Sequence, residues 1–271
     1  MKQKTSLRIL ALVAAAAFIA MVTVNALANI LPLNNMNTGE LSDAIPNLFV
    51  PAGITFAIWG LIYLLLLGYS ATFLATAFNQ KPKFGWTMTD AIVFVANALL
   101  NIAWIFAWHW QMIGLSLLIM FGILATLIML EERNYKAYAT LGEADSNIER
   151  LRRIMLRLPI TVYLGWICVA TIANITAWLV TIGQGGTGFV PIIWTIVVLA
   201  AGTAVALLLI LRRKAYASAV VVLWAYLGII LKRAGTDPEQ TYTIIIAAAL
   251  GMVVIITTMV IKLLPRRIKA S

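Results

Sequence analysis

The hydrophobic residues of this chain gather into eight long runs that are separated by shorter polar segments. A helix crosses a bilayer core, about 30 Å thick, with roughly 20 predominantly apolar residues. Each run approaches or exceeds that length, and the seventh is the shortest. The pattern therefore predicts eight transmembrane helices, at residues 9–31, 48–78, 89–109, 112–130, 158–181, 189–211, 215–231 and 242–264.

The composition supports a membrane location for these helices. The 271 residues are 62% hydrophobic and only 11% charged, whereas a soluble domain has about 45–50% apolar and about 25% charged residues. A chain this apolar cannot cover itself with polar surface in water, and it is too hydrophobic to remain disordered. We therefore expect an all-α integral membrane protein, with the lipid bilayer as its main partner.

The basic residues indicate how the helices are oriented. The chain holds 20 Lys and Arg against 10 Asp and Glu, a net charge of +10. With the N-terminus inside, only Lys232 and Arg233 fall in outer loops, so the other 18 of these 20 residues lie on the inner side, as the positive-inside rule requires. We therefore expect a multi-pass protein of the inner (cytoplasmic) membrane with both termini in the cytoplasm. Because the basic residues serve this orientation, we expect no nucleic-acid partner. The first run resembles a signal peptide, but the even helix count favours a retained helix.

Ionisable side chains are almost absent from the middle of the predicted helices. Asp90 and Lys262 lie near inner helix ends, where they reach water, and His109 lies near the outer surface. A charge at a helix centre costs about 2.5–3.5 kcal/mol on insertion scales, and ion-coupled carriers usually need such a charge. The sequence therefore argues against ion coupling. The charged segment 131–157, the longest outside the membrane runs, is predicted to be a solvated connector.

Candidate catalytic groups are also scarce. An enzyme would need an acid, a base, a metal or an activated nucleophile, for which the chain offers only Tyr residues, His109 and Asp90. A single His and a single Cys, Cys168, cannot form a conventional zinc site. We expect no catalytic residues, no metal and no required cofactor.

Aromatic and Asn residues fall on one stripe in the second, third and fifth predicted helices. Their spacings of three, four, seven or eleven residues keep each set on a single helix face. Asn in hydrocarbon is unfavourable unless it bonds a neighbour, so these faces are expected to point into the bundle. The stripes consist of Phe56, Trp59 and Tyr63, of Asn97, Asn101, Trp104 and Trp108, and of Pro159, Tyr163, Trp166, Ala170, Asn174 and Trp178.

Two interpretations of these stripes stay open. One is helix packing with Asn bridges, together with an interfacial aromatic belt at the helix ends. The other is a cavity whose flat aromatic walls stack a planar ligand while a few polar groups orient it. The predicted topology opens such a cavity outward, with the loop at 32–49 as a lid. Its expected walls are Trp59, Tyr63, Asn101, Trp104, Tyr163 and Trp166.

The same residues carry a resemblance to a known family. After Pro51 the second helix contains W-x3-Y, the third contains N-x2-W, and the fifth contains Y-x2-W-x3-A-x3-N. In order and placement these motifs resemble the tryptophan-rich sensory protein family (TspO/MBR), called translocator protein in mitochondria. The resemblance covers roughly residues 7–182, and the motif of the fifth helix is its most specific part.

The resemblance implies a five-helix membrane domain, at residues 1–188, whose pocket binds porphyrins such as haem beneath the loop between its first two helices. Three additional transmembrane helices, at 189–271, would make this chain an enlarged member. The chain departs from the family in placing Pro159 four residues before Tyr163 instead of directly before it. Carried over position by position, the implied ligand-binding residues are Trp59, Tyr63, Asn101, Trp104, Tyr163, Trp166, Ala170 and Asn174.

We therefore expect a membrane protein that binds a planar hydrophobic ligand, such as a porphyrin or haem, for sensing, sequestration or transfer. The alternative is a small-molecule uniporter without ion coupling. If the ligand is an anionic porphyrin, Lys232 and Arg233 are the outer basic residues that could meet its carboxylates, although neutralisation by Asp237 and Glu239 is favoured. A homodimer is compatible with this expectation.

Overall fold

The computed structural model describes residues 2–31, 33–79, 86–142, 144, 146–184, 190–236 and 238–264. In that part of the chain every regular element is a helix, and eight helices are long and apolar enough to cross a membrane. The prediction of an all-α integral membrane protein with eight spans is confirmed. The long helices are α1 (Lys2–Ile30), α3 (Ile58–Asn79), α4 (Met88–His109), α5 (Ile113–Ala139), α6 (Asn147–Thr181), α7 (Val190–Arg213), α8 (Tyr216–Ala234) and α9 (Pro238–Leu263). The short ones are η1 (Leu33–Asn35), α2 (Thr38–Ala44) and η2 (Gly53–Ala57).

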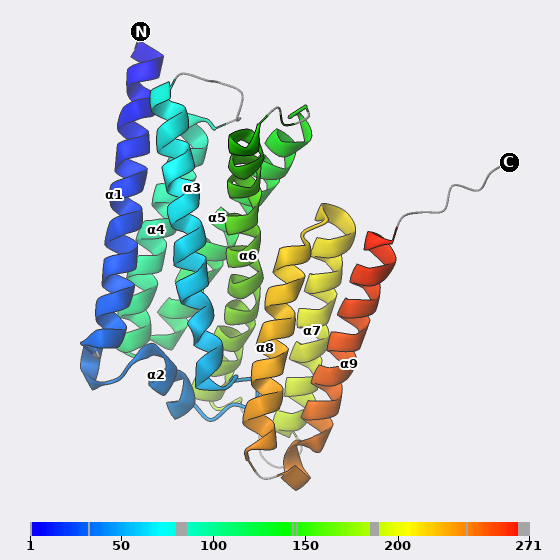
Figure 1. Ribbon diagram of the computed structural model, residues 1–271. Coiled ribbons are helices and arrows are strands. Elements are labelled where there is room, and N and C mark those ends of the chain that lie inside the picture. Colours follow the sequence, from blue (N-terminus) through cyan, green and yellow to red (C-terminus); the bar gives the residue numbers. More distant parts are fainter. Residues whose placement is uncertain are drawn as a thin grey trace, which may run out of the picture.

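The long helices form two neighbouring groups (Figure 1). Helices α1, α3, α4, α5 and α6 pack as one bundle, and α7, α8 and α9 lie beside it, with α8 against α6. Helix α2 lies across one end of the bundle, where α1 ends and α3 begins (Figure 1); this is termed the α2 end. Helix α1 begins and α9 finishes at the opposite end. The segment predicted to act as a lid therefore covers the α2 end.

Small residues let the backbones of α6 and α8 come into direct contact. A Cβ added to Gly165 of α6 would lie 2.7 Å from the Cα of Ser218 on α8, so no larger residue fits without moving one of the helices. At the same place Ser218 Oγ donates a hydrogen bond to the carbonyl of Thr161, at 2.5 Å. Close approach through small residues and hydroxyl bridges is the usual way in which membrane helices associate. The three C-terminal helices are therefore fixed to the bundle through α8.

The charged segment at 131–157 is largely helical, because α5 runs to Ala139 and α6 begins at Asn147. Of its described residues only Glu131, Asn134 and Leu156 are buried, as expected of a solvated connector. Charges at its two borders, however, are paired with neighbouring helices. Arg157 donates to Glu131 Oε1 at 3.1 Å, and the Glu131 side chain is only 4% exposed. Arg213, at the end of α7, forms an ion pair with Glu132. These pairs join α5 to α6 and to α7.

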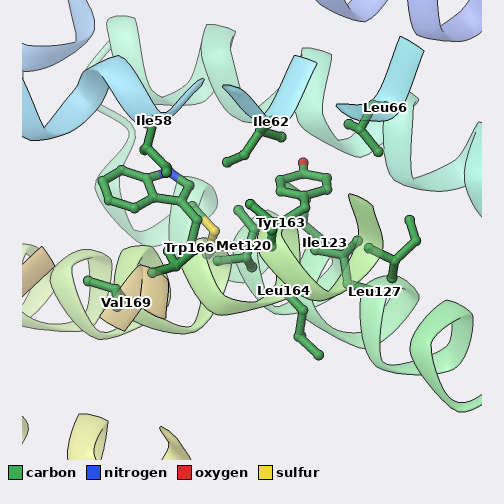
Figure 2. Close-up of a cluster of buried hydrophobic side chains, with 14 of the residues drawn as sticks. Ile58, Ile62, Leu66, Met120, Ile123, Leu127, Tyr163, Leu164, Trp166 and Val169 are labelled. Atoms are coloured by element: carbon green, nitrogen blue, oxygen red, sulfur yellow. The ribbon is translucent and has the colours of Figure 1, made fainter. Parts of the chain in front are cut away.

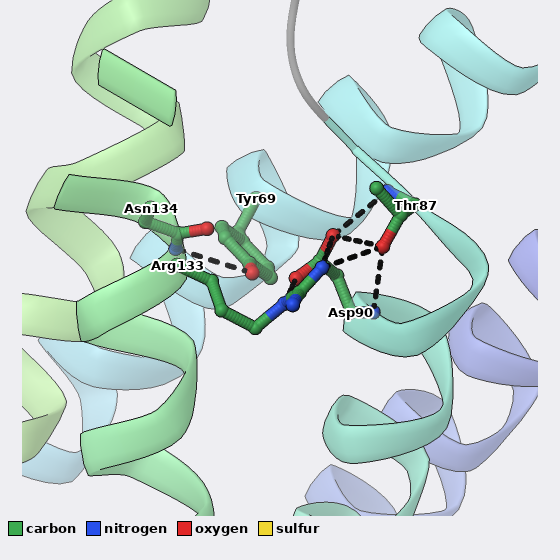
Figure 3. A network of polar contacts seen from close by, with 5 residues as sticks. All are labelled: Tyr69, Thr87, Asp90, Arg133 and Asn134. Atoms are coloured by element: carbon green, nitrogen blue, oxygen red, sulfur yellow. Dashed lines mark hydrogen bonds and ion pairs between the residues drawn. The ribbon is translucent and has the colours of Figure 1, made fainter. Parts of the chain in front are cut away.

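A second polar group closes the end opposite to α2 (Figure 3). The Asp90 carboxylate forms an ion pair with Arg133 of α5 and accepts hydrogen bonds from the backbone N–H and the hydroxyl of Thr87, each at 2.7 Å. Nearby, Asn134 of α5 donates to the Tyr69 hydroxyl of α3 at 3.3 Å. The expectation that Asp90 reaches water is wrong, because these partners enclose it and leave its side chain 4% exposed. These five residues are termed the Asp90 clamp.

Candidate functional site

The start of α2 is fixed by its own sequence. Asn37 Oδ1 accepts hydrogen bonds from the backbone N–H groups of Gly39, at 3.0 Å, and Glu40, at 2.9 Å. The Glu40 carboxylate in turn accepts from the Asn37 N–H at 2.8 Å. This capping box satisfies backbone donors that a bare helix start would leave unpaired. Thr38 and Leu41 are buried, so α2 presents one face to the helices that it covers.

The lid is attached on two sides. Trp108 Nε1 of α4 donates to the carbonyl of Thr38 at 3.4 Å. On the other side Lys232, in the last turn of α8, forms an ion pair with Asp43 near the end of α2. The lid therefore bridges the bundle and the C-terminal helices.

His109 lies under the segment that leads into the lid. Asn34 Nδ2 donates to the backbone carbonyl of His109 at 2.9 Å, and the His109 Nδ1 atom lies 2.8 Å from the carbonyl of Ile105. The ring is fully buried. His109 is the last residue of α4, at the α2 end, and residues that follow α1 cover it there.

A cavity of about 510 Å³ lies beneath α2, between α1, α3 and α4. Aromatic rings from α3 and α4 and amides from α1 meet there with polar residues of the lid. The cavity, termed the aromatic cavity, is lined by Asn25, Asn29, Asn37, Thr38, Gly39, Glu40, Asp43, Gly53, Phe56, Trp59, Tyr63, Trp104 and Ile105.

A narrow pocket of about 50 Å³ extends the aromatic cavity toward α6. The two spaces share Thr38, Phe56, Trp59 and Trp104. Ala170 lines the pocket next to Asn174, and its small side chain leaves room beside the neighbouring rings. Asn174 is itself anchored, since its Oδ1 accepts a hydrogen bond from Ser116 Oγ of α5 at 3.1 Å. The pocket thus places α6 side chains beside the rings that line the aromatic cavity.

The aromatic rings that line these spaces form a wall made of two groups of contacting rings. Trp59 stacks on Tyr63 with ring centroids 5.5 Å apart, and it meets Trp166 edge to face at 6.2 Å. Figure 2 shows Trp166 and Tyr163 pointing from α6 toward α3. Trp104 adds a stacked contact with Trp108, at 5.6 Å. Offset and edge-to-face contacts of this kind are the arrangements that aromatic rings prefer.

Two indole N–H groups of this wall have no acceptor. Trp104 Nε1 and Trp166 Nε1 are buried and make no hydrogen bond, although buried Trp N–H groups usually find a partner. Both side chains line the narrow pocket. The aromatic wall therefore holds two indole donors whose hydrogen-bonding capacity is unused.

Three buried polar side chains form a chain from the edge of the aromatic cavity across the bundle. Asn25 Nδ2 of α1 donates to Asn101 Oδ1 of α4 at 2.8 Å, and Asn101 Nδ2 donates to the Tyr163 hydroxyl of α6 at 2.6 Å. Asn25 was missed in the sequence, where the repeat of Asn25 and Asn29 four residues apart in an apolar run was the available signal. This chain joins three helices and positions the face that carries the rings.

The structure thus separates the eight expected site residues into two sets. Asn101 and Tyr163 lie behind the wall and line neither of the two spaces. Those that line the aromatic cavity or its narrow pocket are Trp59, Tyr63, Trp104, Trp166, Ala170 and Asn174.

Comparison with known proteins is consistent with this arrangement. A family model described as TSPO-like protein matches residues 11–261. The match begins in α1 and ends in α9, so it includes the three helices that the motifs alone do not cover. No curated protein and no solved structure matches the chain. The family resemblance carried by the Trp, Tyr and Asn motifs is confirmed, and the chain belongs to the TSPO-like protein family.

Proposed function

We propose that this protein binds a planar hydrophobic ligand in the aromatic cavity beneath α2. The observation that carries the proposal is the pair of buried, unpartnered indole N–H groups of Trp104 and Trp166 in an aromatic wall. A cavity of about 510 Å³ falls in the range of about 300–1,000 Å³ usual for small-molecule sites, which combine apolar walls with a few placed polar groups.

A tetrapyrrole of the porphyrin or haem type fits this chemistry. Its flat ring system would stack on the Trp59 face, and acceptor atoms at its edge would accept from the indole N–H groups. The polar lid residues Asn37 and Glu40 would remain at the mouth, toward water. The ligand is bound here as cargo or signal, and no required cofactor is part of the proposal.

The proposed role is sensing, sequestration or transfer of that ligand by a protein of the inner membrane. Eighteen of the 20 basic residues, all except Lys232 and Arg233, lie on the side opposite to α2 in the topology derived from the sequence, which places both termini in the cytoplasm by the positive-inside rule. The cavity then opens on the outer side.

Uniport is the less favoured function. Passage through the bundle would require an opening at the end opposite to α2, where the Asp90 clamp and the Glu131–Arg157 pair join neighbouring helices. Breaking a largely buried ion pair is strongly unfavourable. These contacts support binding from the α2 end over flux through the molecule.

The test is a titration of the protein in nanodiscs with protoporphyrin, followed by Trp fluorescence quenching and by the absorption shift of the porphyrin. Trp166→Phe removes one free N–H donor and is expected to lower affinity about threefold to tenfold, the effect of one hydrogen bond. Trp110→Phe is the matched control, because Trp110 is 51% exposed and lines neither space. Absence of saturable binding, or equal affinities in all three proteins, would refute the proposal.

A further inference from the structure

A second and larger cavity lies between the lid and the C-terminal helices. Its volume is about 810 Å³, and its walls come from the segment after α2, the end of α6, the start of α7 and the end of α8. It contains none of the aromatic residues of α3 and α4 that line the aromatic cavity. Asp43 lines both spaces, so the lid separates them. We term it the α8 cavity.

The walls of the α8 cavity are mostly hydrocarbon. Leu48 of the lid segment, Leu179 of α6 and Ile192 of α7 are among the lining side chains. Trp194 lines the cavity as well and is 48% exposed, so the α7 side of the cavity reaches the surface of the helices. In a membrane protein that surface faces acyl chains, and an apolar molecule could enter from the bilayer.

One edge of this apolar space carries two consecutive cations. Lys232 and Arg233, in the last turn of α8, both line the cavity. Lys232 forms an ion pair with Asp43 of the lid. Arg233 is only 6% exposed, and its Nε–H has no hydrogen-bond partner among the residues that the structure describes. A buried guanidinium with an unpaired donor is unfavourable unless an anion meets it.

The sequence suggested other partners for these cations. Neutralisation by Asp237 and Glu239 was expected, but Asp237 and the Glu239 side chain lie outside the described residues. Among the described side chains that line the cavity, Lys232 and Arg233 face the carboxylate of Asp43. These described residues together carry an excess of one positive charge next to hydrocarbon walls.

We propose that the α8 cavity binds an amphipathic anion, with Arg233 as the anchor of its head group. The planar guanidinium presents parallel N–H donors that match a carboxylate or a phosphate. The hydrocarbon walls would hold the apolar body of the same molecule. A free long-chain carboxylate and an anionic phospholipid share this chemistry, and the experiment below distinguishes them. The site is independent of the aromatic cavity.

The experiment is native mass spectrometry of the full chain in a non-ionic detergent. Palmitate is compared with hexadecanol, which has the same chain length and no charge, and phosphatidylglycerol is compared with phosphatidylcholine. One palmitate or one phosphatidylglycerol per chain is expected to bind about tenfold more tightly than its uncharged or zwitterionic counterpart, the effect of a charged hydrogen bond. Palmitate binding identifies a free carboxylate as ligand; phosphatidylglycerol binding alone identifies a lipid head group.

Variants locate the bound molecule. Arg233→Gln is expected to lower affinity about tenfold. Arg212→Gln is the matched control, because Arg212 is an exposed residue in the last turn of α7, at the end opposite to α2, and this change should leave affinity unchanged. Val198→Trp keeps Arg233 and fills part of the cavity that Val198 lines, so binding should fall here also. This second variant decides the matter if Arg233→Gln does not elute as a single folded species. Binding of neither anion, equal binding of hexadecanol, or binding indifferent to both variants would overturn the proposal.

Discussion

At the scale of single residues, Asn101 joins helices and does not contact the proposed ligand. Its amide oxygen accepts a hydrogen bond from Asn25, and its amide nitrogen donates one to the Tyr163 hydroxyl. Asn101→Leu removes both bonds and leaves the polar atoms of its neighbours in an apolar bundle. We expect the free energy of unfolding to fall by about 1–3 kcal/mol, seen as a lower thermal midpoint in detergent.

A graded comparison separates hydrogen bonding from packing at this position. Tyr163→Phe removes only the hydroxyl that accepts from Asn101, so its cost should be about 1 kcal/mol or less. Equal stability of Asn101→Leu and the wild-type protein, or a larger loss in Tyr163→Phe, would contradict this account of the polar chain.

The sequence could predict which helix faces point inward, but not what each residue does there. A helical stripe places Tyr163, Trp166 and Asn174 on one side of α6 because periodicity depends on the helix alone. Whether a side chain lines a cavity or bonds behind it depends on how far neighbouring helices are shifted along their axes. That is why Trp166 faces the pocket whereas Tyr163, three residues earlier, bonds Asn101.

At the scale of elements, the contact between α6 and α8 depends on Gly165. Gly165→Ala would place a Cβ 2.7 Å from Ser218 backbone atoms, which forces the helices apart. We expect a loss of about 1–3 kcal/mol in the free energy of unfolding, the usual cost of overpacking. Chemical or thermal denaturation in detergent measures it.

Gly60 provides the matched control for that change. It lies in α3, and a Cβ added there would meet no atom within 4 Å. Gly60→Ala should therefore leave stability unchanged or raise it, because Ala favours a helix by about 1 kcal/mol over Gly. A destabilisation equal to that of Gly165→Ala would show that close helix approach is not the cause.

The ends of the elements were less predictable than their centres. Hydropathy defines where a helix is in the membrane, but α5 and α6 run on into a charged segment because Glu131 and Arg157 pair between them. Such pairing is a tertiary contact over 26 residues, and local sequence does not show it. The same holds for Asp90. Its place near a helix end predicts contact with water, and local sequence does not show that the fold places Arg133 beside it.

At the scale of the whole molecule, the two ends of the bundle differ in kind. The α2 end holds the lid and both larger cavities, whereas the opposite end is joined by ion pairs such as Asp90–Arg133. Run lengths and charge placement predicted the eight helices and their alternation. They could not predict that α8, which carries no recognisable motif, packs on α6 and holds the lid through Lys232, since nothing local marks that contact.

This difference between the ends makes the proposed orientation testable. Chain ends and 18 of 20 basic residues, all but Lys232 and Arg233, lie opposite to α2 in the derived topology, so the lid should face away from the cytoplasm. In a Cys168→Ser background, which removes the one native thiol, Gln184→Cys reports on the α2 end and Thr140→Cys on the other, since both positions are exposed.

An impermeant maleimide applied to intact cells should label Gln184→Cys and not Thr140→Cys. Thr140→Cys should become reactive only after the membrane is permeabilised, and the Cys168→Ser parent should stay unlabelled throughout. The reverse pattern would place the aromatic cavity on the cytoplasmic side, and labelling of both positions in intact cells would show insertion in two orientations. In the expected case the ligand reaches the lid from outside, and the ion pairs that join α5 to α4 and α6 lie at the cytoplasmic face.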